Sequence, residues 1–318
     1  DRVSEKIAVI GSGLIGRAWA ISFARASFQV DMTDKDPGAL QQAVQILKGS
    51  IEDLADNGLL GGQSVDEVCG RIKTRDEDAY ALDGAVYVQE NTAEDLDVKI
   101  QVYAELDNLA GPNTVIGSST SGFMPSLFTE DLKGRHRCLV AHPINPPYLV
   151  PAVELCPAPW TNRAAMNKAR DIMERAGHVA INMSKEVDGF IVNRMQIALL
   201  HEAFRLVEGG YATCADVDRA IKDGLSHRWS FIGPFETGDL NAPGGIRDYC
   251  TKFSELFERI GKSQTEMTDF KGALLDEFEA QRRSELPADQ LSARTQWRDR
   301  RLMALSLHKK QAVEKFGE

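Results

Sequence analysis

KIAVIGSGLIG, residues 6–16, is the stretch of this 318-residue sequence that decides its fold. Its first part is a short run of aliphatic residues, which is typical of a buried parallel strand. The second part contains Gly11, Gly13 and Gly16 in the GxGxxG spacing, and residues 17–27 continue with the apolar periodicity of a helix. A strand, a glycine-rich turn and a helix in this order predict a dinucleotide-binding unit.

The glycines of this turn have different physical tasks. The first permits the tight turn, the second lets the backbone approach a pyrophosphate, and the third allows close packing of helix on strand. The backbone N–H groups at the start of the helix, around Leu14 and Ile15, are available to the phosphates. A glycine-rich turn without this function is the alternative, and FAD enzymes and some methyltransferases share the fold.

Asp34 favours NAD as the cofactor. It ends the next strand-like run, FQVDMTD (28–34), about the 20 residues on where a carboxylate is expected to meet the adenosine ribose. Its negative charge would repel the 2′-phosphate of NADP.

Strand-like runs alternate with helical segments over the first part of the chain. After the first two, they recur at residues 71–74, 85–90, 114–122, 138–142, 150–155 and 178–183. This alternation predicts an α/β fold with a Rossmann-like, doubly wound sheet. From residue 186 onward the periodicity is helical. We therefore expect an NAD-binding Rossmann domain over residues 1–185 and an all-helical domain for substrate binding and dimerisation over residues 186–318.

Composition excludes several functional classes. The net charge of −10 argues against a nucleic-acid-binding protein. No apolar run approaches the ~18 residues of a membrane span, and the sequence enters a strand too soon for a signal peptide. The five cysteines lie far apart without CxxC pairs, as expected of reduced thiols. We predict a cytoplasmic protein with a small-molecule substrate and no metal site.

The candidate catalytic residues lie in AHPINPPYLVPAVE (141–154). His142 ends one predicted strand and Glu154 ends the next, and the prolines between them form a rigid turn. A dehydrogenase that oxidises an alcohol needs a base for the hydroxyl proton, and the pKa of histidine, ~6.5, suits that task. A carboxylate on the far ring nitrogen fixes the tautomer and stabilises the imidazolium. The alternative is a structural histidine with a surface glutamate.

Other polar residues are predicted near the same site. Ser118, Ser119, Thr120 and Ser121 follow a strand, at the sheet edge where ligands of α/β proteins bind. Asn193 lies at the start of the first helix after the domain junction. Ser121 and Asn193 are candidates to hold the reacting oxygen, although such residues are also common in turns and helix caps.

The strings GSGLIG, SSTSG, AHPINPPYLVPAVE, DGFIVNR and IGPFE, in this order, resemble the L-3-hydroxyacyl-CoA dehydrogenase superfamily. The resemblance implies that His142 is the general base and Glu154 its partner, with Ser121 and Asn193 contacting the substrate oxygen. It also implies that Glu94 and Lys99 lie near the nicotinamide half of NAD. A homodimer is expected on the same ground.

Departures from the fatty-acid enzymes of this superfamily concern the substrate. The sequence has HPINPP in place of HFFNP, and residues 51–73, where those enzymes have a basic CoA-contacting hairpin, are largely acidic or neutral up to Arg71. A CoA 3′-phosphate would find few partners there. The closer resemblance of these variant strings within the superfamily implies a small L-3-hydroxy acid, such as L-gulonate, as the substrate. Its carboxylate needs a cation, for which Arg228 is the candidate, and Asn145 is expected in the same cleft. An exposed Arg228 on a loop is the alternative.

Two other functions remain open. One is a short-chain L-3-hydroxyacyl-CoA dehydrogenase, which keeps the chemistry and changes the substrate. The other is an abundant structural protein that binds NADH without catalysis.

Overall fold

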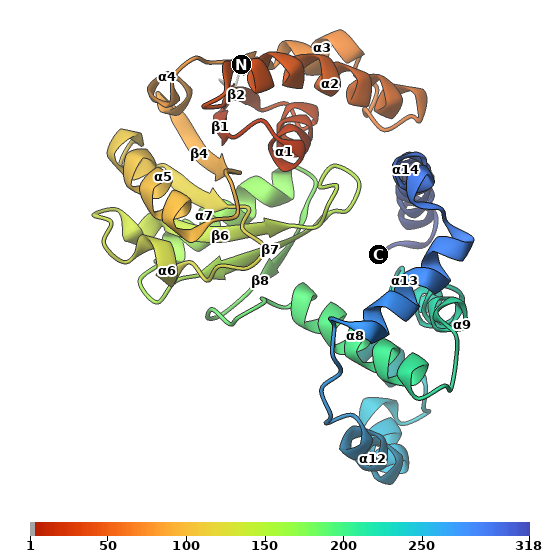
Figure 1. Ribbon diagram of the computed structural model, residues 1–318. Helices are drawn as coiled ribbons and strands as arrows, with labels where there is room; N and C mark the ends of the chain where they lie inside the picture. Colours follow the sequence, from red (N-terminus) through yellow and green to blue (C-terminus); the bar gives the residue numbers. More distant parts are fainter. Residues whose placement is uncertain (1–3) are drawn as a thin grey trace. The chain divides into compact units, whose positions relative to one another are not determined.

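The computed structural model describes residues 4–318, which group into two compact units (Figure 1). One unit contains the residues up to Val192 together with Thr295–Glu318, and the other contains Asn193–Arg294. This division comes later than the predicted boundary at residue 185. Residues 295–318, which we expected in the C-terminal domain, group instead with the N-terminal residues.

The first unit is built on one eight-stranded sheet with the order β3-β2-β1-β4-β5-β6-β7-β8. Neighbouring strands are parallel, except that β6 and β7 are antiparallel. The sequence indicated a strand at each of these places, and the predicted fold class is confirmed. The strands are β1 (Lys6–Ile10), β2 (Gln29–Thr33), β3 (Ile72–Thr74), β4 (Ala85–Glu90), β5 (Val115–Ser118), β6 (Cys138–Pro143), β7 (Ala152–Pro157) and β8 (Val179–Asn182).

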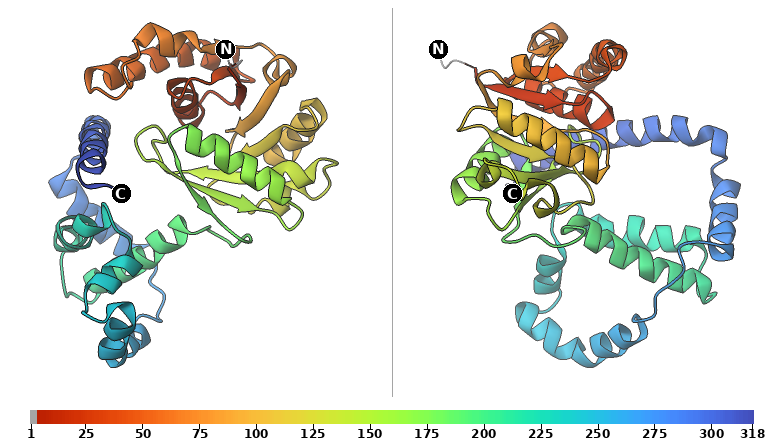
Figure 2. Two further views of the ribbon diagram at one scale, coloured as in Figure 1. Left: turned by 180° about the vertical axis from the view of Figure 1, so that it is seen from behind. Right: turned by 60° about the vertical axis from the view of Figure 1, so that its left-hand side comes forward.

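Helices cover both faces of this sheet (Figure 2). Successive strand residues point to opposite faces, so Ile7 and Val9 pack in one apolar cluster, while Ala8 and Ile10 pack in another. The first cluster is shared with α1, α2, α3 and α7, and the second with α4, α5 and α6. The bounds are α1 (Leu14–Arg25), α2 (Pro37–Asp56), α3 (Val65–Gly70), α4 (Asp78–Leu82), α5 (Leu96–Leu109), α6 (Ser126–Thr129), the 3-10 helix η1 (Arg135–Arg137) and α7 (Arg163–Arg175).

Part of α14 (Leu291–Phe316) also packs on the first unit. Met303 is buried in the first apolar cluster, and Leu302 packs against it. The Ser306 hydroxyl lies 3.3 Å from the backbone oxygen of Leu149. This helix therefore contributes to the core of the sheet unit, in addition to the solvated face that its charged residues predict.

The second unit contains only helices among its described elements, as the sequence predicted. They are α8 (Val192–Glu208), α9 (Cys214–Arg219), the π-helix η2 (Ala220–Leu225), α10 (Ser226–Trp229), α11 (Pro234–Leu240), α12 (Gly245–Ser263), α13 (Ala273–Glu285) and the 3-10 helix η3 (Ala288–Gln290), followed by the start of α14.

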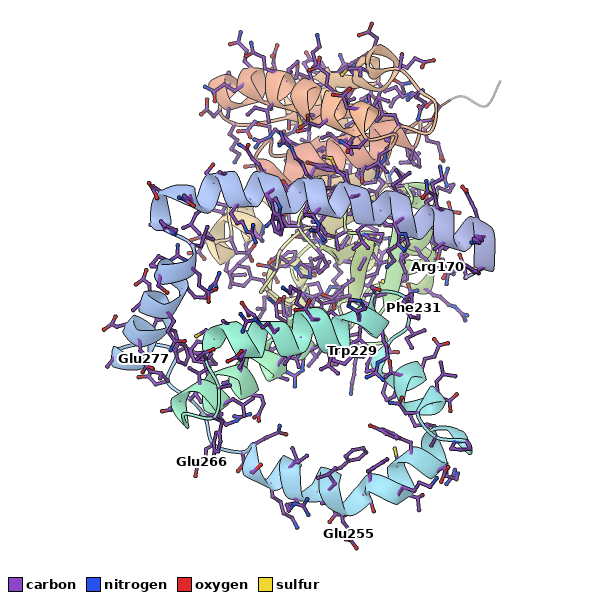
Figure 3. All side chains as sticks on the ribbon, turned by 90° about the vertical axis from the view of Figure 1, so that its right-hand side faces the viewer. Arg170, Trp229, Phe231, Glu255, Glu266 and Glu277 are labelled. Atoms are coloured by element: carbon purple, nitrogen blue, oxygen red, sulfur yellow. The ribbon has the colours of Figure 1, made fainter. Side chains whose placement is uncertain are left out.

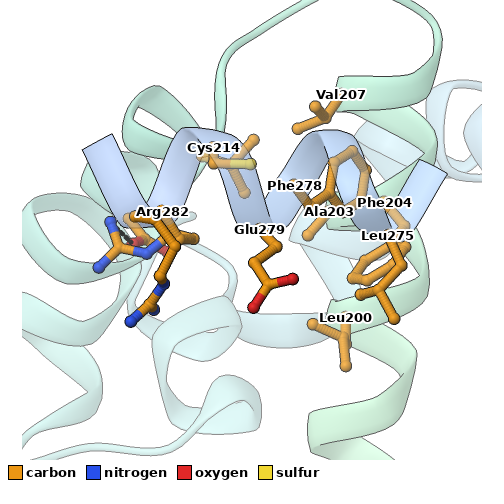
Figure 4. A pocket seen from close by; sticks show the side chains of 12 residues that line it. Leu200, Ala203, Phe204, Val207, Cys214, Leu275, Phe278, Glu279 and Arg282 are labelled. Carbon is orange, nitrogen blue, oxygen red and sulfur yellow. Dashed lines mark ion pairs between the residues drawn. The ribbon is translucent and has the colours of Figure 1, made fainter. Parts of the chain in front are cut away.

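Apolar side chains of α8, α9 and α13 line a cavity of about 450 Å³ within this second unit (Figure 4). Phe204 and Phe278 meet edge to face there, with ring centroids 4.4 Å apart. Charged residues such as Glu255 on α12 and Glu277 on α13 are exposed, and they extend away from their helices (Figure 3). No helix that the structure describes is long and apolar enough to span a membrane.

Candidate active site

The turn between β1 and α1 has space for a ligand at one of its three glycines. Gly11 has φ of +94°, and a Cβ at Gly16 would lie only 1.9 Å from the Gly11 oxygen, so both positions exclude a side chain. At Gly13, by contrast, no heavy atom lies within 4 Å of the position that a Cβ would take. The backbone at Gly13 is therefore open to close approach by a ligand.

The first turn of α1 is suited to an anion. Gly13 is its N-cap and supplies no side-chain hydrogen bond, and no acidic residue lies in the first turn. The N–H groups of that turn, which includes Leu14 and Ile15, thus lack a side-chain cap, and the helix dipole places partial positive charge there. Both features fit the pyrophosphate of a dinucleotide.

Asp34 follows β2 and lies beside this turn. Its carboxylate accepts hydrogen bonds from the backbone N–H and the hydroxyl of Ser12, both at 2.7 Å, and from the N–H of Asp36 at 2.9 Å. Partial burial raises the pKa of Asp34, but these hydrogen bonds outweigh that effect and lower it. The side chain is therefore negatively charged at neutral pH, which favours NAD over NADP.

His142 and Glu154 face each other across β6 and β7, because these two residues are paired in the strand register. The Nδ1 atom of His142 lies 2.7 Å from one carboxylate oxygen of Glu154, and both side chains are buried. The other carboxylate oxygen accepts the backbone N–H groups of Ile191 and Val192, at 2.7 and 2.8 Å. The structure thus brings the two residues together, but Glu154 is the third residue of β7 and does not end its strand as predicted, because β7 runs antiparallel to β6.

The Glu154 carboxylate sets the tautomer of His142. Burial raises the pKa of Glu154, whereas the hydrogen bonds from His142, Val192 and Ile191 lower it, and the net direction is downward. An ionised carboxylate only accepts hydrogen bonds, so Nδ1 of His142 carries the proton and Nε2 of the neutral ring keeps its lone pair. The buried ring of Phe190 lies against the imidazole, with centroids 5.4 Å apart. In this arrangement Nε2 is the ring atom that can accept a proton.

Four hydroxyl residues, Ser118–Ser121, lie at the end of β5 and directly after it. Ser118 donates to Glu90 at 2.9 Å, and Thr120 donates to Glu94. Ser119 donates to Asn91 and accepts from Trp19 and Gln89. Ser121 is the exposed member of the four.

Glu94 and Lys99 lie in different surroundings. Glu94 is exposed and accepts the Thr120 hydroxyl. Lys99 is fully buried, and its ammonium lies 2.9 and 3.2 Å from the two carboxylate oxygens of Glu90, which is also fully buried. Glu90 was not among the site residues predicted from the sequence. The available signal was an acidic residue at the end of an otherwise apolar strand, followed by a lysine within the next helix.

Asn145 lies in the first unit, whereas Asn193 and Arg228 lie in the second. Asn145 is exposed in the turn between β6 and β7. Asn193 is the second residue of α8, directly after Val192. Arg228 is exposed on the short helix α10, and its guanidinium is 3.4 Å from the Asn241 side chain. Among residues 4–318, no cluster of His, Cys, Asp and Glu has the arrangement of a metal site.

A dinucleotide-binding turn and a His–Glu pair at one edge of a doubly wound sheet define a nicotinamide-dependent dehydrogenase. Residues 6–187 match the family model for the NAD-binding domain of 3-hydroxyacyl-CoA dehydrogenase, and residues 189–284 match its C-terminal domain. The chain belongs to the 3-hydroxyacyl-CoA dehydrogenase family and is an NAD-dependent oxidoreductase that acts on hydroxyl groups.

Relatives of this chain carry several names. Lambda-crystallin of Oryctolagus cuniculus is 38% identical over 96% of each chain. L-carnitine dehydrogenase of Pseudomonas putida is 36% identical over 77% of this chain and 76% of its own length. The structure of 5-formyl-3-hydroxy-2-methylpyridine-4-carboxylic acid 5-dehydrogenase, an NAD+-dependent dismutase, has a TM-score of 0.82 and 26% identity, covering 99% of this chain and 100% of its own.

Proposed function

We propose that the chain oxidises the 3-hydroxyl of a small L-3-hydroxy acid to the 3-keto acid, with His142 as the general base. The 2.7 Å hydrogen bond from His142 Nδ1 to buried Glu154 carries this proposal. It leaves Nε2 as the basic atom of a histidine at the ligand-binding edge of the sheet.

In the proposed reaction, Nε2 of His142 takes the proton of the C3 hydroxyl while the hydrogen on C3 leaves as a hydride, and the C3–O bond becomes a carbonyl. When bound, NAD supplies the acceptor for that hydride. Glu154 stabilises the imidazolium by its negative charge and by the existing hydrogen bond. Ser121 and Asn193 hold the reacting oxygen, a role that rests on the family resemblance.

The cofactor is proposed to lie on the turn at Gly11, Gly13 and Gly16, with its pyrophosphate at the N–H groups of the first turn of α1. Asp34 would accept the ribose hydroxyls. Glu94 would lie near the nicotinamide half, as the resemblance implies for it and for Lys99.

The proposed substrate carries a free carboxylate and is small. The resemblance to lambda-crystallin, also known as L-gulonate 3-dehydrogenase, makes L-gulonate the first candidate. Arg71, the first cation of residues 51–73, donates through Nη1 to the backbone oxygen of Ala24 and to the Gln63 side chain, so part of its guanidinium is directed into the protein. Arg228 would bind the substrate carboxylate, and Asn145 would lie in the same cleft.

Substitution of His142 tests the proposal. His142→Gln removes the base, so turnover of L-gulonate with NAD is expected to fall by at least about 1,000-fold. The dissociation constant of NADH, measured by fluorescence, should stay within about threefold. Substantial turnover by this variant would contradict the assignment.

The substrate is tested by assaying the wild-type enzyme with L-gulonate, L-carnitine and acetoacetyl-CoA. Faster turnover of the CoA ester would favour the acyl-CoA dehydrogenase instead. NADH binding without turnover of any 3-hydroxy acid would favour the non-catalytic, structural role. We further propose a cytoplasmic homodimer, on the resemblance and the cysteines, all five of which are free thiols.

A further inference from the structure

A buried ion pair lies at the carboxyl ends of the central strands. Glu90 is the last residue of β4, and Lys99 lies in the first turns of α5. Their side chains are 0% and 1% exposed, and the ammonium contacts both carboxylate oxygens. Withdrawing two charges from water is costly unless the geometry and further hydrogen bonds compensate for it. The surroundings of Glu90 supply those bonds.

The Glu90 carboxylate is connected to the segment that carries Ser121. It accepts the Ser118 hydroxyl at 2.9 Å, and the Ser118 oxygen in turn accepts the backbone N–H of Thr120 at 3.1 Å. The backbone oxygen of Glu90 accepts the N–H of Ser119 at 2.9 Å. The conformation of residues 118–120 is therefore tied to Glu90 through both backbone and side chain.

The same segment is fixed a second time at Thr120. Its hydroxyl oxygen accepts the backbone N–H of Phe123 at 3.1 Å and donates to Glu94. Ser121 therefore lies between Thr120 and Phe123, which are hydrogen-bonded to each other, and Thr120 is in turn hydrogen-bonded to Ser118. A change at Glu90 would therefore reach Ser121 through the backbone of residues 118–120.

We propose that Glu90, Lys99 and Ser118 are positioning residues, which set the conformation of residues 118–123 and so place Ser121 for catalysis. The Lys99 ammonium contacts both carboxylate oxygens of Glu90, and Ser118 donates its hydroxyl proton to the same carboxylate. The Ser118 oxygen is then oriented to accept from Thr120. In this proposal Lys99 acts on Ser121 indirectly, through Glu90. The proposal rests on the proposed function only for the catalytic role of Ser121.

The test compares removal of two buried ion pairs. The double variant Glu90→Gln/Lys99→Met removes both charges of this pair, and Ser118→Ala removes only its link to Thr120. The matched control is Asp107→Asn/Arg137→Met. Asp107, in α5, and Arg137, the residue before β6, form another buried pair, 2.8 Å apart. That pair is at the opposite end of β6 from His142.

Both test variants should lower kcat for the 3-hydroxy acid by about tenfold or more, and Ser118→Ala should change the dissociation constant of NADH less than threefold. The control pair should lower the melting temperature but keep kcat within twofold. If kcat and the pH profile of kcat in Ser118→Ala match those of the wild type, the proposal is wrong. Since Ser118→Ala keeps the Glu90–Lys99 ion pair, it tests the positioning role even if the double variant does not fold.

Hydrogen exchange separates this proposal from the proposed function. The amides of Thr120 and Phe123 should exchange at least tenfold faster in Ser118→Ala than in the wild type, and at the wild-type rate in the control. Unchanged exchange would overturn the positioning role whatever the activity. Faster exchange in a protein that turns over no 3-hydroxy acid would retain it and reject the proposed function.

Discussion

Gly13 and Gly16 differ in what surrounds them, and the difference can be tested one residue at a time. A Cβ at Gly16 would overlap the Gly11 oxygen, so Gly16→Ala should lower the free energy of unfolding by roughly 3 kcal/mol. Gly13 has φ of −67° and open space beside it, so Gly13→Ala should fold normally. Its methyl group would instead occupy the space of the pyrophosphate. We expect its NADH dissociation constant to rise at least about tenfold, a loss of ~1.4 kcal/mol of binding.

Thermal melting and NADH fluorescence titration on the two variants check this prediction. Gly49, in the middle of α2 and also without close neighbours, offers a control alanine substitution away from the turn. Equal loss of stability at Gly13 and Gly16 would show that both glycines serve packing alone.

Single residues also show where the sequence was informative. The His142–Glu154 pair was predictable, because a short turn between two strands forces them to be antiparallel and places their facing residues together. The Glu90–Lys99 pair was not predictable, because Lys99 comes nine residues after Glu90, on a helix whose sequence predicts a solvent-exposed face. A buried ion pair depends on tertiary packing, and the local pattern does not record it.

His178 connects three elements of the sheet unit. It precedes β8, its Nε2 is 2.9 Å from the Ser22 hydroxyl of α1, and its Nδ1 is 3.1 Å from the oxygen of Pro151, just before β7. Burial lowers the pKa of His178 to about 4. The unfolded chain, with a histidine pKa of ~6.5, binds more protons between these values, so stability falls as pH decreases through this range.

We therefore expect His178 to contribute roughly 3 kcal/mol to the loss of unfolding free energy between pH 6.5 and pH 4. Urea unfolding at several pH values should show a weaker pH dependence for His178→Gln than for the wild type. His136→Gln, at an exposed histidine, is the matched control and should keep the wild-type dependence. An identical slope in all three proteins would contradict the prediction.

The sequence predicted the positions of strands and helices better than it predicted which of them pack together. The central strands were indicated by their apolar runs, since burial between two helical layers leaves few polar positions. β3, at the sheet edge, has a single apolar residue, Ile72, followed by exposed Lys73 and Thr74. The return of residues 295–318 to the sheet unit was not foreseen. Only a few apolar residues of α14, such as Leu302 and Met303, pack on that unit, among many charged ones.

Oligomeric state is a property of the whole molecule. Several large apolar side chains of α12 are about two-fifths exposed, among them Phe253, Phe257 and Ile260. Two of these rings, Phe253 and Phe257, are neighbours on one face, 6.2 Å apart. An exposed apolar face of this kind is typical of a surface that another chain covers.

Light scattering should give a mass of about 70 kDa, twice the 35.1 kDa of one chain, if the proposed homodimer forms. Phe253→Glu/Phe257→Glu should reduce that mass to one chain, because buried charges in an interface are costly. Glu255→Lys, at an exposed position of the same helix, is the control. A wild-type mass of one chain would reject the homodimer.

The division of the chain has a consequence for its synthesis. Residues up to Val192 and Thr295–Glu318 belong to one compact unit, with Asn193–Arg294 inserted between them. At roughly 5–20 residues per second, a ribosome needs about 5–20 s to translate the insertion. During that time the sheet lacks Leu302 and Met303, and the apolar surface that they cover is open to other molecules. The nascent sheet unit should accordingly bind chaperones longer than a Rossmann domain whose core is complete within one continuous segment.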